Sequence, residues 1–161
     1  MNQELQFNEY IKSHKNLILK VTSVYCYNSE ERKDLVQEIV LQLWKSFPKY
    51  DSSFKFSTWA YRIALNVCIS YVRKTIVRNK AIQEYKDFIE IDIVENSEES
   101  ENLNRLYQVF NILRPIEKAI ITLNLEECSN KEIAKIIGIT PTNVSTRILR
   151  IKNKLKNHLS K

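Results

Sequence analysis

The polar and basic side chains best placed to do chemistry lie near the C-terminal end of the chain. Residues 141–161 contain six basic residues and no acid. Ahead of them, Ser129 and Glu132 have the spacing of a helix capping box, Gly138 can form a left-handed turn, and Thr140 can cap a following helix. Apolar residues keep helical spacing on both sides of the turn, at Ile133, Ile137, Val144 and Ile148. A short helix, a tight turn and a longer basic helix predict a helix-turn-helix.

In a helix-turn-helix, the second helix enters the major groove of DNA with its N-terminal residues nearest the base edges. The residues expected to contact bases or phosphates there are Thr142, Asn143, Ser145, Thr146 and Arg147. Arg150 and the lysines beyond it are better placed to hold phosphates. The alternative is a helical hairpin with a solvated basic face. It explains the charges, but it leaves the coincidence of the cap, the lone glycine and the apolar register unexplained.

A second group of residues combines aromatic rings with cations. Pro48 is expected to end a helix, and the loop after it carries Tyr50, Phe54, Lys55 and Phe56. A further helix is expected to begin at Ser57 or Thr58, and helical spacing places these residues on one narrow face: Trp59, Arg62, Asn66, Ser70 and Arg73. Rings beside cations suit single-stranded nucleic acid, because bases stack on the rings while cations hold the backbone. An aromatic loop that packs onto its own core is an equally good interpretation.

The charge pattern also favours a nucleic-acid partner. The chain of 161 residues has a formal net charge of +6. Residues 54–83 contain six basic residues and no acid, whereas residues 84–101 contain eight acids and one lysine. Two basic blocks, the second at residues 141–161, are thus separated by an acidic one, which suggests two nucleic-acid-facing surfaces joined by a tether. Ordinary solvated helix faces are the alternative interpretation of the charges.

The pattern of apolar residues predicts an all-α protein of two small helical domains joined by an acidic linker. A single glycine and three prolines in the chain favour long helices over a β-sandwich. Apolar stripes predict one helix over residues 3–27, with His14 packed within it, and a second over 28–47 capped by Asn28. Residues 88–93 alternate like a strand, or could be an extended segment that docks on a partner. The expected domains are residues 1–82 and 103–161, with a linker over 83–102.

Several function classes are not expected. Three widely spaced cysteines without a CxxC motif argue against a disulfide framework and a zinc site. The sequence has no glycine-rich phosphate loop and no convincing catalytic arrangement, so neither an enzyme nor a cofactor is predicted. No segment has the length of a signal peptide core or a membrane span, which predicts a cytoplasmic protein without membrane insertion.

These motifs together resemble the extracytoplasmic-function group of bacterial RNA polymerase sigma factors. The N-terminal half resembles their promoter-melting domain through Asp34-Leu-Val-Gln-Glu38, Leu43-Trp44, Phe56-Ser-Thr-Trp-Ala-Tyr-Arg-Ile-Ala64, Asn66 and Arg73-Lys74. The C-terminal half resembles their helix-turn-helix domain through Leu113-Arg-Pro-Ile-Glu117, Asn130-Lys-Glu-Ile-Ala134, Gly138-Ile-Thr and Asn143-Val-Ser-Thr-Arg-Ile-Leu-Arg150. The resemblance covers nearly the whole chain, with the motifs in the family's order.

The resemblance implies partners and residue roles. Core RNA polymerase (its β′ and β subunits) and promoter DNA are the implied partners, and an anti-sigma factor is expected. The polymerase β′ coiled coil would meet Asp34, Leu35, Gln37 and Glu38. The loop from Tyr50 to Phe56 would capture a flipped base of the minus-ten element, with Trp59, Arg62, Asn66 and Arg73 along the DNA. The minus-thirty-five element would be read by Thr142, Asn143, Ser145, Thr146, Arg147 and Arg150.

The sequence departs from the family pattern in two places. Lys55 and Phe56 occupy a stretch in which many members have a glycine before the aromatic residue, and Leu65 stands where a basic residue is common.

Two other functions compete with the sigma interpretation. A stand-alone helix-turn-helix regulator would explain residues 103–161 but would leave the aromatic loop unassigned. A polymerase-binding inhibitor would bind polymerase without any dependence on a promoter.

Overall fold

The computed structural model describes residues 2–86 and 108–160 of the chain, and every regular element in these two ranges is helical. The all-α prediction is therefore confirmed for the part of the chain that is described. The strand-like pattern at residues 88–93 and most of the predicted linker lie outside it. None of the described helices is both long enough and apolar enough to cross a lipid bilayer.

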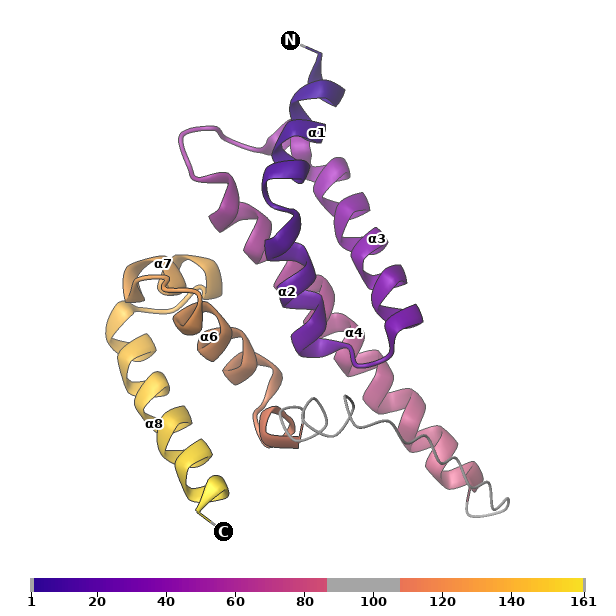
Figure 1. Ribbon diagram of the computed structural model, residues 1–161, viewed down its shortest axis with the longest axis vertical. Coiled ribbons are helices and arrows are strands. Elements are labelled where there is room, and N and C mark those ends of the chain that lie inside the picture. The colour runs from indigo at the N-terminus through magenta and orange to yellow at the C-terminus, as the bar shows by residue number, and fades with distance from the viewer. Residues whose placement is uncertain (1, 87–107, 161) are drawn as a thin grey trace.

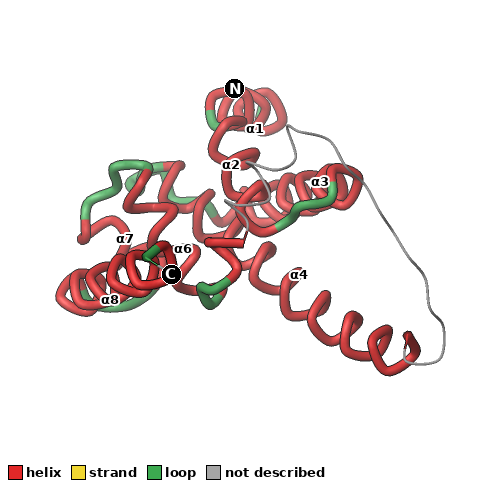
Figure 2. Tube along the Cα trace, turned by 60° about the horizontal axis from the view of Figure 1, so that its bottom comes forward, coloured by secondary structure: helices red, strands yellow, loops and turns green. Residues whose placement is uncertain are grey.

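Four long helices form the N-terminal unit, which we define as residues 2–86. They are α1 (Gln3–Ser13), α2 (Lys15–Tyr25), α3 (Ser29–Ser46) and α4 (Phe56–Lys86), and a short 3-10 turn, Phe47–Lys49, follows α3 (Figure 1). Asn2 caps α1 by accepting a hydrogen bond from the Glu4 N–H. Asn28 caps α3, as predicted, by accepting from the backbone N–H groups of Glu30 and Glu31. Beyond the bundle, the C-terminal half of α4 projects away from the other helices (Figure 2).

The first apolar stripe forms two helices instead of the predicted one over residues 3–27. The chain leaves α1 at His14, whose φ of −115° is not helical, and α2 begins at the next residue. The His14 N–H donates to the carbonyls of Tyr10 and Ile11, and its Nδ1 lies 2.8 Å from the Tyr10 carbonyl oxygen. The half-buried ring also lies 4.8 Å from that of Phe56. The prediction that His14 is a packed histidine is thus confirmed, but the residue lies at the break between two helices and not within one.

The boundaries of α4 also differ from the prediction. The helix begins at Phe56, not after a cap at Ser57 or Thr58, and it ends at Lys86. Its first turn forms because the Trp59 N–H donates to the Lys55 carbonyl. Starting the helix at Phe56 places that ring on the inner side of the N-terminal unit, which bears directly on the candidate site.

The C-terminal unit, which we define as residues 108–160, contains the predicted helix-turn-helix. After a helical segment at residues 108–111 come α6 (Pro115–Leu125), α7 (Asn130–Ile137) and α8 (Pro141–Leu159). The Ser129–Glu132 capping box opens α7, as predicted. Gly138 ends α7 with a left-handed φ of 85°, and Thr140 caps α8 by accepting from the Asn143 N–H. The cap, glycine and apolar register therefore form the turn for the reasons that the sequence suggested.

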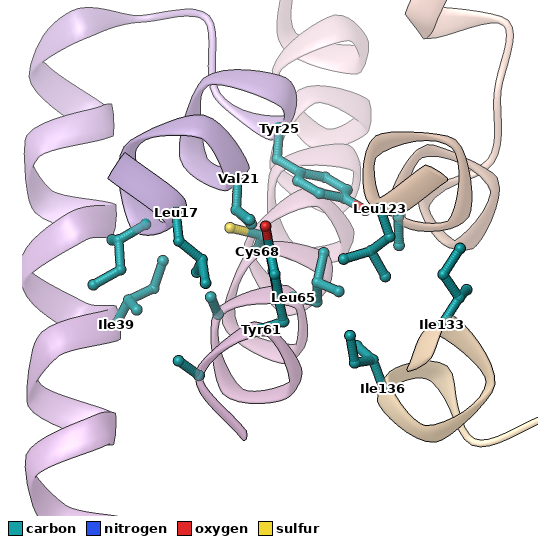
Figure 3. Close-up of a cluster of buried hydrophobic side chains, with 14 of the residues drawn as sticks. Leu17, Val21, Tyr25, Ile39, Tyr61, Leu65, Cys68, Leu123, Ile133 and Ile136 are labelled. Atoms are coloured by element: carbon teal, nitrogen blue, oxygen red, sulfur yellow. The ribbon is translucent and has the colours of Figure 1, made fainter. Parts of the chain in front are cut away.

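The two units pack against each other through an apolar contact. Figure 3 shows Tyr61 and Leu65 of α4 facing Leu123 of α6 and Ile136 of α7. Leu65 is only 3% exposed. This apolar residue, which stands where the family commonly has a basic one, is therefore buried in the contact. The Tyr25 hydroxyl on α2 donates to the Pro115 carbonyl at 2.7 Å. The residues of this contact come from α2 and α4 on one side and from α6 and α7 on the other, so it joins the two halves of the chain.

Candidate nucleic-acid interface

The helix-turn-helix presents the predicted contact residues on the outer side of α8. Ile133 and Val144, both fully buried, hold α7 against α8, and Ile148 continues the contact. Five of the six predicted side chains are exposed, and Arg147 is half-buried. The exposed ones are Thr142, Asn143, Ser145, Thr146 and Arg150. The arrangement matches a recognition helix whose N-terminal turns are free to enter a groove.

Hydrogen bonds already order several of these side chains. The Asn130 amide nitrogen donates to the Ser145 hydroxyl oxygen at 2.8 Å and ties α7 to α8. The Thr146 hydroxyl donates back to the Thr142 carbonyl at 3.1 Å. The Nε of Arg147 donates to the Asn143 side-chain oxygen at 3.0 Å. The sequence predicted the membership of this set but gave no indication of these pairings, because they depend on side-chain rotamers.

The basic residues further along α8 are not equivalent. Lys152 and Lys156 are exposed and free to approach phosphates. The Nζ of Lys154 instead lies 3.1 Å from a carboxylate oxygen of Glu117 on α6. Burial alone would raise the pKa of Glu117, but the Arg114 N–H and Lys154 outweigh it and lower that pKa. The expected phosphate-holding role therefore fits Lys152 and Lys156 better than Lys154.

The aromatic residues of the predicted loop lie mostly in the core of the N-terminal unit. Phe56 is 4% exposed and stacks on Tyr10 with 4.6 Å between ring centroids. The Tyr50 and Trp59 rings, both half-buried, lie 5.0 Å apart, and Trp59 lies 5.3 Å from Phe56. Phe54, in contrast, is 59% exposed. Phe56 was expected in an open loop, but α4 begins at this residue and its ring is turned inward. Its expected role in capturing a base stays a prediction.

The loop that carries Phe54 is ordered by its own polar groups. The Tyr50 hydroxyl donates to the Phe54 carbonyl at 2.7 Å, and the Asp51 carboxylate accepts from the Ser53 N–H at 2.9 Å. The second of these bonds lowers the pKa of Asp51, because it stabilises the ionised form. Phe54 is consequently held outward on a short turn, with Lys55 exposed beside it.

The exposed face predicted for α4 is present. Arg62, Asn66, Ser70 and Arg73 are all exposed, while the opposite side of the helix is buried at Ala60, Ala64 and Cys68. Trp59, at the start of this stripe, is half-buried by the aromatic cluster. The stripe therefore offers two guanidinium groups and an amide to a ligand, with an indole edge at one end.

An open groove of about 760 Å³ runs between α3 and α4. Asp34, Leu35 and Glu38 line it from α3, and Asn66 and Lys74 are among its residues on α4. Leu35 is buried at this groove, whereas Asp34, Gln37 and Glu38 are exposed. The groove thus brings Asp34, Leu35 and Glu38, three of the four predicted polymerase-facing residues, close to Asn66 and Ser70 of the α4 stripe, whereas Gln37 does not line it.

Sequence reasoning missed a polar cluster at one end of this groove. Glu31 of α3 accepts hydrogen bonds from the Tyr71 hydroxyl and, at 3.3 Å, from Arg78, both on α4. The Tyr71 and Arg78 bonds lower the pKa of Glu31. Burial, together with the bonds to Cys26 and Glu31, raises the pKa of Tyr71. The sequence indicated Glu31 only as a capping residue, and its pairing across 40 positions with Tyr71 has no local signal.

Two ion pairs connect the N-terminal and C-terminal units. Lys20 of α2 lies 2.9 Å from Glu126, and Lys55 of the aromatic loop lies 3.3 Å from Glu132 of α7. The Ser129 N–H and Lys55 lower the pKa of Glu132. Burial raises the pKa of Tyr61 to about 12, and nearby Cys128 and Glu126 add to the effect. One residue of the candidate DNA surface, Lys55, is therefore engaged by the C-terminal unit in this arrangement.

Comparison with known proteins identifies both units. Residues 10–76 match the family model of sigma-70 region 2, and residues 103–155 match that of sigma-70 region 4. The ECF RNA polymerase sigma factor SigW of Bacillus subtilis is 25% identical over 95% of this chain and 88% of its own length. The ECF RNA polymerase sigma-E factor of Haemophilus influenzae is 24% identical over 95% of this chain and 87% of its own length.

Two solved structures have the same fold. The structure of CnrH in complex with the cytosolic domain of CnrY matches with a TM-score of 0.75, at 19% identity, over 99% of this chain and 90% of CnrH. The sigma factor RpoE from Bartonella quintana, solved with the anti-sigma factor NepR, matches with a TM-score of 0.73, at 20% identity, over 96% of this chain and 97% of RpoE.

Proposed function

This chain belongs to the extracytoplasmic-function sigma factors of RNA polymerase, and we propose which of its residues bind polymerase and which bind promoter DNA. As a sigma factor it binds core RNA polymerase and promoter DNA and directs transcription initiation. The domain assignment that we propose is residues 1–82 for polymerase and the minus-ten element, 83–102 as a linker, and 103–161 for the minus-thirty-five element.

The exposed side chains of α3 bind the coiled coil of the polymerase β′ subunit. The observation that supports this assignment is the groove between α3 and α4, with Asp34 and Glu38 at its edge and Leu35 buried beside them. Gln37 lies on the same helix and is exposed. A helix laid along α3 would meet carboxylates and amides first, so basic residues on the partner would complement this surface.

The minus-ten element binds along α4 and the loop before it. Phe54 is the exposed ring on which a base that leaves the duplex can stack, and Lys55 stands beside it. Arg62, Asn66 and Arg73 continue along the exposed stripe and would hold the strand backbone. Tyr50, Phe56 and Trp59 support the loop from the aromatic cluster. No catalytic step is involved, because binding of bases and polymerase offsets an unstacking cost of a few kcal/mol per base.

The minus-thirty-five element binds to the N-terminal turns of α8, with Arg150, Lys152 and Lys156 on phosphates. Reading both promoter elements requires the two units to separate. The element names imply a spacing of about 25 base pairs, or roughly 85 Å of B-form DNA. In the structure the 3.3 Å pair of Lys55 and Glu132 ties the loop before α4 to α7, so the two DNA-binding units are packed against each other. Polymerase would therefore bind the chain in a more open form.

The protein acts in the cytoplasm, where its polymerase is, and an anti-sigma factor regulates it. RpoE of Bartonella quintana was solved with the anti-sigma factor NepR, and CnrH with the cytosolic domain of CnrY. A partner of this kind would cover the groove between α3 and α4 and thereby exclude polymerase.

Fluorescence anisotropy with a labelled promoter duplex tests the proposal against a stand-alone regulator. The chain alone is expected to bind the duplex weakly and the chain with core polymerase strongly. Tight, saturable binding by the chain alone, unaffected by polymerase, would instead support a regulator that acts through residues 103–161. If the chain and core polymerase together bound duplexes with and without the promoter sequence equally well, the result would support an inhibitor.

A further inference from the structure

One side chain in the first turns of α8 has its orientation set by a neighbour. Arg147 is the only cation between residues 141 and 147. Its Nε donates to the Asn143 side-chain oxygen at 3.0 Å. The guanidinium has five N–H donors, so this bond uses one and leaves the four on the two Nη groups. Among the described residues no hydrogen bond or ion pair to those Nη groups is present.

Asn143 is itself fixed at the start of the helix. Its backbone N–H donates to the Thr140 hydroxyl at 3.2 Å as part of the N-terminal cap. Asn143 lies one turn before Arg147, and helical side chains lean toward the N-terminus of their helix. The pair therefore holds the guanidinium over the N-terminal turns of α8, and the end-on edge formed by its two Nη groups is not used by this bond.

The neighbouring hydroxyls are not equivalent donors. Thr146 uses its hydroxyl hydrogen on the Thr142 carbonyl at 3.1 Å, which leaves a methyl group and an acceptor for DNA. The Ser145 oxygen accepts from Asn130 at 2.8 Å, which leaves one O–H to donate. Within residues 141–147, Arg147 alone carries a guanidinium that can present two parallel N–H donors. In the major groove two adjacent acceptors occur on guanine, at O6 and N7.

We propose that Asn143 is a positioning residue that fixes Arg147 to read one guanine in the upstream promoter element. The proposal rests on the assignment of α8 to that element and adds the base and the residue that sets the specificity. Losing the Asn143 contact would free the guanidinium to rotate and to bind phosphates, which carry no sequence information. The effect of Asn143 should therefore fall on base preference at one position, not on binding as a whole.

A transcription selection tests this. A run-off template that responds to the protein is randomised over about one helical turn of its upstream element, transcribed by core polymerase with each variant, and sequenced. The native chain is expected to enrich guanine at one position, Arg147→Ala to abolish that enrichment, and Asn143→Ala to reduce it about 5-fold or more, while preferences at other positions stay. Asn143→Asp keeps the acceptor and should retain the enrichment. Asn153→Ala, on the same helix and exposed, is the matched control.

A chemical probe separates guanine reading from general weakening. Replacing the selected guanine by 7-deazaguanine removes N7 alone. This replacement should weaken promoter binding by polymerase with the native chain, whereas it should not change promoter binding with the Arg147→Ala variant. A native profile in Asn143→Ala, or an equal loss of preference at every position, would overturn the inference and leave α8 as a DNA-binding helix. Transcription with no upstream base preference by the native chain would contradict the assignment of α8 itself.

Discussion

The Nζ of Lys55 lies 3.3 Å from a carboxylate oxygen of Glu132 and joins the loop before α4 to the first turn of α7, across 77 positions of sequence. Both side chains are more than one-third exposed, so this pair alone contributes little to stability. The apolar contact that buries Leu65 is the stronger tie between the two units. The packing of the two units therefore depends mainly on buried apolar area.

Leu65→Lys should open the contact between the units. A lysine placed among Tyr61, Leu123 and Ile136 would be buried without a partner, which costs on the order of a few kcal/mol. Small-angle X-ray scattering should show a larger radius of gyration, with the helical circular dichroism signal retained. Asn66→Lys, at the exposed neighbouring position, should leave the radius unchanged. An unaltered radius in folded Leu65→Lys would mean that Leu65 does not hold the units together.

Phe54 and Phe56 should behave oppositely although two positions separate them. Phe56→Ala removes a buried ring and should lower the free energy of unfolding by about 3–5 kcal/mol, measured by urea denaturation. Phe54→Ala should leave stability nearly unchanged, because its ring is 59% exposed, and should reduce promoter opening in permanganate footprints of unpaired thymines. Normal opening in the Phe54 variant would remove this ring from the minus-ten site.

The Glu31 cluster should make stability depend on pH. Hydrogen bonds from Tyr71 and Arg78 lower the pKa of Glu31 from its usual value of 4.5 in the folded state. The unfolded chain therefore binds a proton at this site first, so the stabilisation is present above about pH 4.5 and is lost as pH falls through the folded pKa. In urea titrations, native protein and Glu31→Gln should differ more at pH 7 than at pH 3. A difference that does not change with pH would contradict the role of the ionised carboxylate.

Substitutions of Gly138 should lower stability because of its backbone conformation, not because a side chain lacks space. Its φ of 85° disfavours any side chain with a Cβ, although a Cβ there would meet no atom within 4 Å. Gly138→Ala should lower the free energy of unfolding by about 1 kcal/mol or more. Gly138→Asn should cost less, because asparagine tolerates the left-handed region. Equal costs for the two variants, measured by thermal unfolding, would point to a steric cause instead.

The parts of the fold set by local signals were predictable from the sequence. The Ser129–Glu132 box, the Gly138 turn and the Thr140 cap act within a few residues of each other, and all three formed as expected. The apolar spacing of residues 3–27 did not reveal the break at His14, because both helices keep their stripes on the same core. Spacing alone cannot detect a change of direction that leaves the buried face in register.

The features that sequence did not predict depend on contacts between distant residues. Whether Phe56 faces the solvent depends on where α4 begins and on the Tyr10 ring, which lies 46 positions away by the numbering of the chain. The family pattern marked Leu65 as unusual, but only its packing against the C-terminal unit gives a reason for an apolar residue there. The bonds from Tyr71 to Glu31 and from Arg147 to Asn143 depend on side-chain rotamers, which no residue pattern encodes.

Run-off transcription tests the central claim most directly. Purified core polymerase is given genomic promoter fragments with and without this protein, and binding of the protein to core polymerase is measured in parallel. The account predicts discrete transcripts that appear only when the protein is present. Binding to core polymerase without any new transcript, over fragments that cover the genome, would contradict it.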